Sequence, residues 1–358
     1  MADSPRGDSR SLGKRLIHGS VKAALALITL VVLLACVGAI YQLTGNWRDA
    51  RRFPQRGKSV QAGQVKLNLN CGGAGSPTVI LESGGGMSSI GWINIQPEIA
   101  KFTRVCSYDR AGYGWSEPGP EPRTSLQIAH ELKLLLDTAG EKGPYVMVGP
   151  SLGGIYVRVY AGLYPADVAG VVLVDATHED QLDRIDAIFP PGKEHRKQSQ
   201  ERAAKLNRIL TPLTIHLGIE RFETAVGRDT PPFLSQAFME EFLYLEQQTK
   251  FRNALASEMK ALPQSLPQAR SAGNLGDRPL IVLTAGKMNF VPEPGLTKEV
   301  EDQLRNLWIH VLQVEEASLS TRGKQIIVPD STHTIQFERP DAVISAIHEV
   351  WSAATAAQ

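Results

Sequence analysis

The sequence has almost no excess of charge of either sign, and it contains no internal repeat or low-complexity tract. Its 38 Lys and Arg residues balance 37 Asp and Glu residues, which gives a formal net charge of +1 at pH 7. Recognition of nucleic acid requires a basic field, so we expect no nucleic-acid partner. Hydrophobic residues make up 42% of the chain, enough for a large core, and disorder is therefore not expected.

One long uncharged run lies near the N-terminus, at residues 23–41. A helix of about 19 residues rises close to the ~30 Å of a bilayer's hydrocarbon core, so we predict a single membrane-spanning anchor over residues 23–42. A cleaved signal is the alternative, because LLAC at residues 33–36 resembles a lipoprotein cleavage box that would leave Cys36 lipidated. The run stays apolar beyond this box, which favours an uncleaved anchor.

Orientation in the membrane is poorly determined by charge, because basic residues flank the run on both sides. A short polar tail, residues 1–22, followed by one span favours placement of the main domain outside the cytoplasm. Residues 43–62 contain Gly45, Pro54 and Gly57 and are interpreted as a linker. Roughly 295 residues follow, which suits one large domain.

Short β-rich runs alternate with helical patterns from residue 63 onward, which is typical of a largely parallel sheet covered by helices. The expected strands are residues 64–70, 78–82, 104–108, 145–148, 170–175, 279–284 and 325–328. The expected helices are residues 125–138, 152–163, 297–314 and 340–354. The alternation stops at residues 179–275, where helical patterns at 196–210 and 234–256 have no convincing strand between them. These residues are interpreted as a helical cap inserted between the core segments 63–178 and 276–358.

The motif Gly149-Pro-Ser-Leu-Gly153 carries the clearest chemical signal. It follows an expected strand and opens an expected helix. In this setting a tight turn holds the serine in a strained, exposed position, and the flanking glycines avoid collisions with the neighbouring strand and helix. We therefore predict that Ser151 is a nucleophile.

Five segments together resemble the α/β-hydrolase superfamily: LESGGGMSS, YDRAGYGWS, VGPSLGG, LVDATHED and DSTHTIQFERPDAV, in this order. The resemblance covers roughly residues 60–355 and implies an α/β-hydrolase fold with a mostly parallel sheet and a helical cap. It also implies acyl transfer through a Ser-His-Asp triad and an acyl-enzyme, a small-molecule acyl substrate and no cofactor.

By this resemblance the base is His333, which follows the last expected strand. The acid departs from the commonest family pattern, because Asn289 stands about where that pattern has an aspartate. A minority of the family carries the acid after the sixth strand, and there we assign Asp175. Glu293, in the later loop, is the alternative acid. An oxyanion hole is expected from the backbone N–H groups of Leu152 and of Gly85.

Two other clusters suggest cofactor or metal sites, and both are rejected. Asp109-Arg110-x-Gly112-x-Gly114-x-Ser116 lacks the phosphate-binding and dinucleotide fingerprints, and in the family it is a structural turn. His178-Glu179-Asp180 are adjacent in sequence, and three adjacent residues rarely point at one ion, so no metal is expected.

The resemblance makes the strands that carry Cys71 and Cys106 sheet neighbours. The two cysteines are therefore either a disulfide in an oxidising compartment or two buried thiols. Ester hydrolysis is the favoured reaction. An aminopeptidase, a thioesterase, a lactonase, a cofactor-free haloperoxidase and a catalytically silent membrane-anchored binding protein remain alternatives. The aromatic residues of the cap are candidates to wall the substrate pocket: Phe189, Phe222, Phe233, Phe242 and Tyr244.

Overall fold

The computed structural model describes residues 9–188, 202, 206, 210–227, 231, 233–288 and 296–357. The chain divides into two compact units. The first contains Met1–Phe53 and Glu201–Asp229, and the second contains Pro54–Gln200 and Thr230–Gln358.

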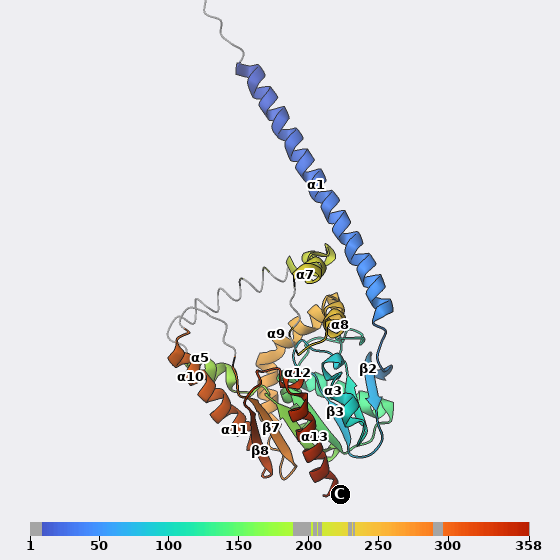
Figure 1. Cartoon of the computed structure of the whole chain (residues 1–358), viewed down its shortest axis with the longest axis vertical. Helices are drawn as coiled ribbons and strands as arrows, with labels where there is room; N and C mark the ends of the chain where they lie inside the picture. The colour runs from blue at the N-terminus through green and yellow to red at the C-terminus, as the bar shows by residue number, and fades with distance from the viewer. Residues whose placement is uncertain are drawn as a thin grey trace, which may run out of the picture. The chain divides into compact units, whose positions relative to one another are not determined.

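An eight-stranded sheet organises the second unit (Figure 1). Its strand order is β1 (Lys58–Ala62), β2 (Val65–Gly72), β4 (Val105–Tyr108), β3 (Thr78–Leu81), β5 (Tyr145–Pro150), β6 (Val168–Val174), β7 (Leu280–Ala285) and β8 (Gly323–Val328). The pairs β1–β2 and β2–β4 are antiparallel, and every other neighbouring pair is parallel. The mostly parallel sheet is as predicted.

Helices cover both faces of the sheet because its central strands are apolar on both sides. Alternate residues such as Val146 and Val148 face one core cluster, while Tyr145 and Met147 face the other. The first cluster includes residues of α2 (Gln96–Ile99) and α13 (Pro340–Thr355). The second includes residues of α3 (Ser125–Ala139), α4 (Leu152–Leu163), α9 (Thr249–Ser271) and α11 (Gln313–Ala317).

The remaining described helices of this unit lie in the connections. They are η1 (Ser89–Trp92), η2 (Pro165–Asp167), α5 (Gln181–Ile188), α8 (Gln236–Glu246), α10 (Lys298–Leu307), η3 (Trp308–Leu312) and α12 (Ile335–Glu338). Two predicted helices are divided. The helix predicted over residues 234–256 is α8 and α9, because Gln248 is extended and begins a new helix. The helix predicted over 297–314 changes from α-helical to π-helical geometry at η3.

The interpretation of residues 43–62 as a linker is wrong. The first unit contains α1 (Ser9–Arg52), which continues through residues 43–52, and Lys58–Ala62 form β1 at the edge of the sheet. Neither Gly45 nor the polar residues after Tyr41 stop the helix. The residues His18–Arg52 include an 18-residue window with a mean hydropathy of 2.8, so α1 is long and apolar enough to cross a membrane.

The predicted cap is not one unit in the structure. Residues 201–229 group with α1 and include α7 (Ile219–Gly227), whereas α5, α8 and α9 belong to the unit that contains the sheet. Most of the helix predicted over residues 196–210 lies outside the described residues.

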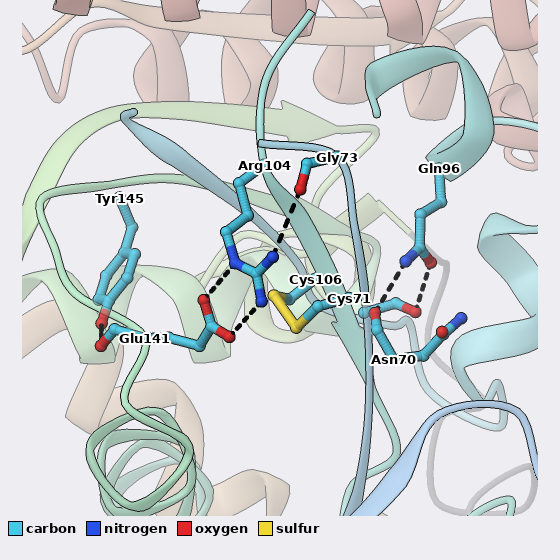
Figure 2. Close-up of a disulfide and its surroundings, with 9 residues drawn as sticks. Asn70, Cys71, Gly73, Gln96, Arg104, Cys106, Glu141 and Tyr145 are labelled. Carbon is cyan, nitrogen blue, oxygen red and sulfur yellow. Dashed lines mark hydrogen bonds and ion pairs between the residues drawn. A yellow bond between two sulfur atoms is a disulfide. The ribbon is translucent and has the colours of Figure 1, made fainter. Parts of the chain in front are cut away.

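A disulfide joins Cys71 of β2 to Cys106 of β4, which are direct partners in the antiparallel register (Figure 2). Of the two alternatives for these cysteines, the structure therefore has the disulfide. Beside it, the guanidinium of Arg104 donates to both carboxylate oxygens of Glu141, each at 2.6 Å. A covalent bond and an ion pair thus stabilise the edge of the sheet that contains the antiparallel strands.

Candidate active site

Ser151 lies in the tight turn between β5 and α4. Its backbone has φ 49° and ψ −126°, a conformation that L-residues rarely adopt and that costs about 1–3 kcal/mol. The turn is held from outside, because the Ser151 N–H donates to the carbonyl of Val174 and the Thr177 N–H donates to the carbonyl of Ser151. The strained turn expected of a nucleophilic serine is therefore present, with Ser151 half-buried in it.

The two glycines of the motif are required by close packing. A Cβ atom at Gly149 would lie 2.6 Å from the carbonyl oxygen of Gly153, and one at Gly153 would lie 2.8 Å from the carbonyl oxygen of Ser83. Both distances are shorter than real Cβ contacts allow. The pattern Gly-x-Ser-x-Gly is thus a packing requirement of this turn.

Asp175 and His333 form a direct pair, with Oδ2 of Asp175 2.6 Å from Nδ1 of His333. Asp175 follows β6 and is 2% exposed, while His333 follows β8 and its side chain is 53% exposed. The carboxyl ends of parallel strands lie at one edge of a sheet, so Ser151 and this pair share that edge. In the described part of the chain, no hydrogen bond joins Ser151 to His333.

The second oxygen of Asp175 has two donors. Oδ1 accepts from the backbone N–H of Ala285 at 2.9 Å and from the indole Nε1 of Trp308 at 2.9 Å. Trp308 begins the π-helical turn η3, and no local pattern around it predicts its contact with Asp175. Because His333 lies on the other oxygen, both carboxylate oxygens have partners and the orientation of the carboxylate is fixed.

The glycine-rich loop after β3 lies against the serine turn. A Cβ at Gly84 would meet the Cβ of Ser151 at 3.5 Å, and one at Gly85 would meet the Leu152 side chain at 3.4 Å. Leu152 is the first residue of α4, so its N–H has no acceptor within the helix. The structure thus brings together Gly85 and Leu152, the two residues whose N–H groups the family resemblance implies as oxyanion donors.

The side chain of Arg110 holds this loop by hydrogen bonds to its backbone. Its guanidinium donates to the carbonyls of Ser83 at 2.6 Å and Gly84 at 2.9 Å, and it pairs with Glu82 at 2.7 Å and with Glu258 of α9 at 2.8 Å. All three charged side chains are at most 1% exposed. No local sequence pattern predicts this network, since Arg110 and Glu258 lie 148 residues apart.

The electrostatics of the network follow from its burial. Burial alone would lower the pKa of Arg110, but the carboxylates of Glu258 and Glu82 outweigh this effect and raise that pKa well above its ordinary value. Burial raises the pKa of Glu82, and the charge of Arg110 opposes that rise. The guanidinium therefore remains charged and keeps its hold on both loop carbonyls.

A cavity of about 280 Å³ opens beside Ser151, Gly85 and Leu152. Its other lining residues are Thr177, Gln181, Leu182, Leu255, Met259, Leu262 and Leu266. The wall is therefore aliphatic and comes mostly from α9. The expectation of an aromatic wall is wrong for Phe242 and Tyr244, which pack in a separate cluster around Phe238 and Phe337. Phe222 and Phe233 are exposed, and Phe189 lies outside the described residues.

The Asp109 segment forms a turn that its acid ties to neighbouring segments. The carboxylate of Asp109 accepts from the N–H groups of Ser89 at 2.7 Å and Trp115 at 3.0 Å and from the Asn68 amide at 2.9 Å. A Cβ at Gly114 would overlap this carboxylate at 2.2 Å. The segment thus uses its glycines and its acid for its own turn.

The acidic residues near His178 are paired with arginine. Arg158 bonds to Glu179 and, at 2.9 Å, to Glu316. Burial raises the pKa of Glu316 to about 7. Burial opposes the shift of Glu179, but Arg158 outweighs it and lowers that pKa to about 2. His178, Glu179 and Glu316 have potential ligand atoms within 4.8 Å of one another, and Arg158 places one positive charge against the two carboxylates. Asn289 and the alternative acid Glu293 lie outside the described residues.

Comparison with known proteins agrees with this architecture. A family model of the alpha/beta hydrolase fold matches residues 77–276. A curated 2-hydroxy-6-oxo-2,4-heptadienoate hydrolase of Pseudomonas putida is 26% identical over 246 residues, which cover 66% of this chain and 85% of that protein. The solved structure of a thermophilic esterase from Thermogutta terrifontis is similar in fold, with a TM-score of 0.55, 18% identity, and coverage of 83% of this chain and 97% of that one.

Other curated relatives are much longer than the segment that they share with this chain. An uncharacterized vacuolar membrane protein of Saccharomyces cerevisiae is 36% identical over 123 residues, 33% of this chain and 19% of that protein. The chain covers only 16 to 19% of the length of three such relatives.

Proposed function

Because the chain belongs to the α/β-hydrolase superfamily, we propose that it is a serine hydrolase that cleaves a carboxylic ester or a similar acyl compound. The observation that carries the proposal is the 2.6 Å pairing of Asp175 with His333 at the sheet edge that also holds the strained Ser151. A base oriented by a buried acid, near a serine in such a turn, is the arrangement that acyl transfer requires.

The proposed reaction has two steps. Because Asp175 accepts from Nδ1, the neutral ring of His333 carries its proton there and has a lone pair at Nε2. Nε2 takes the hydroxyl proton as Oγ of Ser151 bonds to the carbonyl carbon, and it then gives that proton to the departing alcohol. Water next attacks the acyl-enzyme and gives one proton to His333, which returns it to Oγ as the acid leaves.

Negative charge forms on the substrate's carbonyl oxygen in both steps. The proposed hydrogen-bond donors to this oxygen are the backbone N–H groups of Gly85 and Leu152. Such donors stabilise the transition state most when their positions are fixed before the reaction. The hydrogen bonds from Arg110 to the carbonyls of Ser83 and Gly84 support this role, since they hold the backbone directly before Gly85.

The cavity supports an apolar acyl group as the part of the substrate that is recognised. Leu182, Leu255, Met259, Leu262 and Leu266 offer hydrophobic surface and no charge. Its volume of about 280 Å³ lies near the lower end of the range for small-molecule pockets, which favours acyl chains of short to medium length.

A fluorophosphonate probe and a series of p-nitrophenyl esters test the proposal. We expect the folded protein to be labelled, the Ser151→Ala variant to remain unlabelled, and kcat/KM to rise with acyl length until the cavity is full. A folded protein that is not labelled, or a Ser151→Ala variant that is labelled as strongly as the original, would contradict the proposal.

We also propose that α1 anchors the protein in a membrane with the hydrolase unit outside the cytoplasm. The apolar window of α1 supports the span, and the Cys71–Cys106 disulfide favours an oxidising compartment. This orientation is measured by adding a protease to intact cells and to permeabilised cells and comparing how much of the protein is cleaved. We expect cleavage of the hydrolase unit from outside, without access to the cytoplasm.

A further inference from the structure

Within the first unit, residues 210–227 pack closely against α1. A Cβ at Gly38 would lie 2.2 Å from the carbonyl oxygen of Leu217, and one at Gly218 would lie 2.9 Å from the carbonyl oxygen of Gly38. Gly218 has φ +68°, a conformation that suits glycine, at the bend between the two helical parts of this segment. Contact between the two backbones is therefore possible only because both positions are glycine. We call residues 210–227 the docked segment.

An arginine fixes the docked segment to α1. Arg221 donates to Asp49 at 2.6 Å, to Asn46 at 2.8 Å and to Gln42 at 3.2 Å. The side chains of Arg221 and Asp49 are each 12% exposed, so the ion pair is largely shielded from water. Gly38, Gln42, Gly45 and Asp49 recur at the spacing of one helix face, and this face of α1 receives the segment.

The contact lies where the apolar run of α1 ends. The run stops at Tyr41, and the polar residues that bind Arg221 begin at Gln42. Tyr41 and Trp47 are 39% and 60% exposed, and aromatic residues at the end of a span are typical of the membrane–water interface. At ~1.5 Å per residue, positions 38–49 extend over about 16 Å, the depth of the outer acyl and headgroup region.

The exposed surface of the docked segment is mostly apolar, although His216 and Glu223 are exposed as well. Ile215, Gly218 and Arg221 are shielded, whereas the exposed residues include Leu210 at 44%, Leu213 at 54%, Ile219 at 41%, Phe222 at 58% and Val226 at 66%. Short helices that expose such side chains beside an anchor at interface depth are suited to lie in the boundary between headgroups and acyl chains.

We propose that the docked segment is a second membrane-binding element, whose exposed apolar side chains insert into the interface of the bilayer that α1 spans. The occupant of this surface is lipid, since the surface continues directly from the span at the same depth. The inference depends on the proposed anchoring by α1 and is independent of the proposed ester hydrolysis.

Depth-dependent fluorescence quenching tests the proposal on the full chain in phosphatidylcholine nanodiscs that hold one copy each. An environment-sensitive NBD label is attached to Phe222→Cys in a Cys36→Ser background, under non-reducing conditions that keep Cys71 and Cys106 bonded. The control is Lys101→Cys, an exposed position of the hydrolase unit, in the same background. The native Cys36, labelled in the otherwise unchanged chain, reports the span.

We expect the label at position 222 to emit at shorter wavelength than the control and to be quenched several-fold more by lipids that carry a nitroxide near the headgroup. Aqueous iodide should quench the control several-fold more. The Cys36 label should respond to nitroxides deep in the acyl region. Iodide quenching at position 222 equal to that of the control would overturn the proposal. So would a shielded label that requires two copies per disc, because a second copy would then be the occupant, and so would a Cys36 label that deep nitroxides do not reach.

Discussion

The two sides of Ser151 are built differently. On one side, Asp175 is buried but its partner His333 is 53% exposed, and the pair is held by a few hydrogen bonds. On the other side, the loop that contains Gly85 is held by Arg110, which lies between two carboxylates that are at most 1% exposed. Under the proposed mechanism, a proton carrier must adjust during each step, whereas oxyanion donors are most effective when they are stationary.

This contrast predicts that substitutions on the two sides will affect different quantities, turnover on one side and stability on the other. Changes on the acid side should reduce turnover and leave the fold intact, because the exposed histidine contributes little packing. Changes on the oxyanion side should reduce stability first, because they remove a charged partner from a buried ion-pair network.

The largest expected effect lies on the acid side. Asp175→Asn should lower kcat by up to about 10⁴-fold, because an amide cannot stabilise an imidazolium as a carboxylate does. Its thermal unfolding midpoint should change little. Steady-state kinetics and a melting curve measure both quantities. Glu293→Gln is the matched control and should retain near-normal kcat; the opposite ranking would move the acid to the later loop.

The next effect lies on the oxyanion side. Glu258→Gln should lower the free energy of unfolding by roughly 1.5–3 kcal/mol, since Arg110 would lose one of its two buried carboxylates and keep its pair with Glu82. Denaturant titration measures this loss. Glu349→Gln, which removes an exposed pair with Lys324, is the control and should be nearly neutral. Equal melting behaviour of the two variants would mean that the network does not hold the fold.

The disulfide tests whether stability can be lost without loss of turnover. The Cys71→Ser/Cys106→Ser double variant removes a cross-link between positions 35 residues apart, and loop-closure entropy predicts a loss of about 3–4 kcal/mol. Because this edge of the sheet supplies none of the proposed catalytic groups, kcat at a temperature where the variant is folded should be unchanged. A large fall in kcat there would show that this edge supports the site.

Much of the fold and the candidate site could be predicted because the signals are local. Ser151 and Asp175 directly follow β5 and β6, His333 lies five residues after β8, and parallel strands bring their carboxyl ends to one edge. The resemblance to the α/β-hydrolase superfamily, and not a local signal, made β2 and β4 neighbours and allowed the disulfide to be considered. The contact between Asp175 and His333 joins residues 158 positions apart, and it could be predicted from the position of Asp175 at the end of its strand. The other two partners of Asp175, Ala285 and Trp308, could not.

The features that could not be predicted depend on distant contacts or on weak local patterns. β1 has five residues between Gly57 and Gly63 and resembles a linker, yet it is stabilised by pairing with β2. α9 continues through Pro263 and Pro267, which local propensity alone would place outside a helix. Trp308 lies in a helical pattern that gives no sign of the π-helical turn from which its indole reaches Asp175.

Trp308 offers the smallest and most specific test of the acid side. Trp308→Phe keeps an aromatic ring but removes the N–H donor to Oδ1 of Asp175. We expect kcat to fall about 10-fold, with KM and the melting temperature nearly unchanged, which corresponds to about 1.4 kcal/mol. The matched control is Trp351→Phe, which removes an indole bond to the carbonyl of Pro77 and no bond to a residue of the proposed triad.

A pH profile separates positioning by Trp308 from general packing. Without the indole donor, the charge on Asp175 is less dispersed and attracts the imidazolium of His333 more strongly. The acidic limb of the kcat/KM profile should then move to higher pH in Trp308→Phe and remain in place in Trp351→Phe. If both variants lost activity equally with unchanged profiles, Trp308 would only fill space, and the orientation of Asp175 would depend on Ala285 and His333 alone.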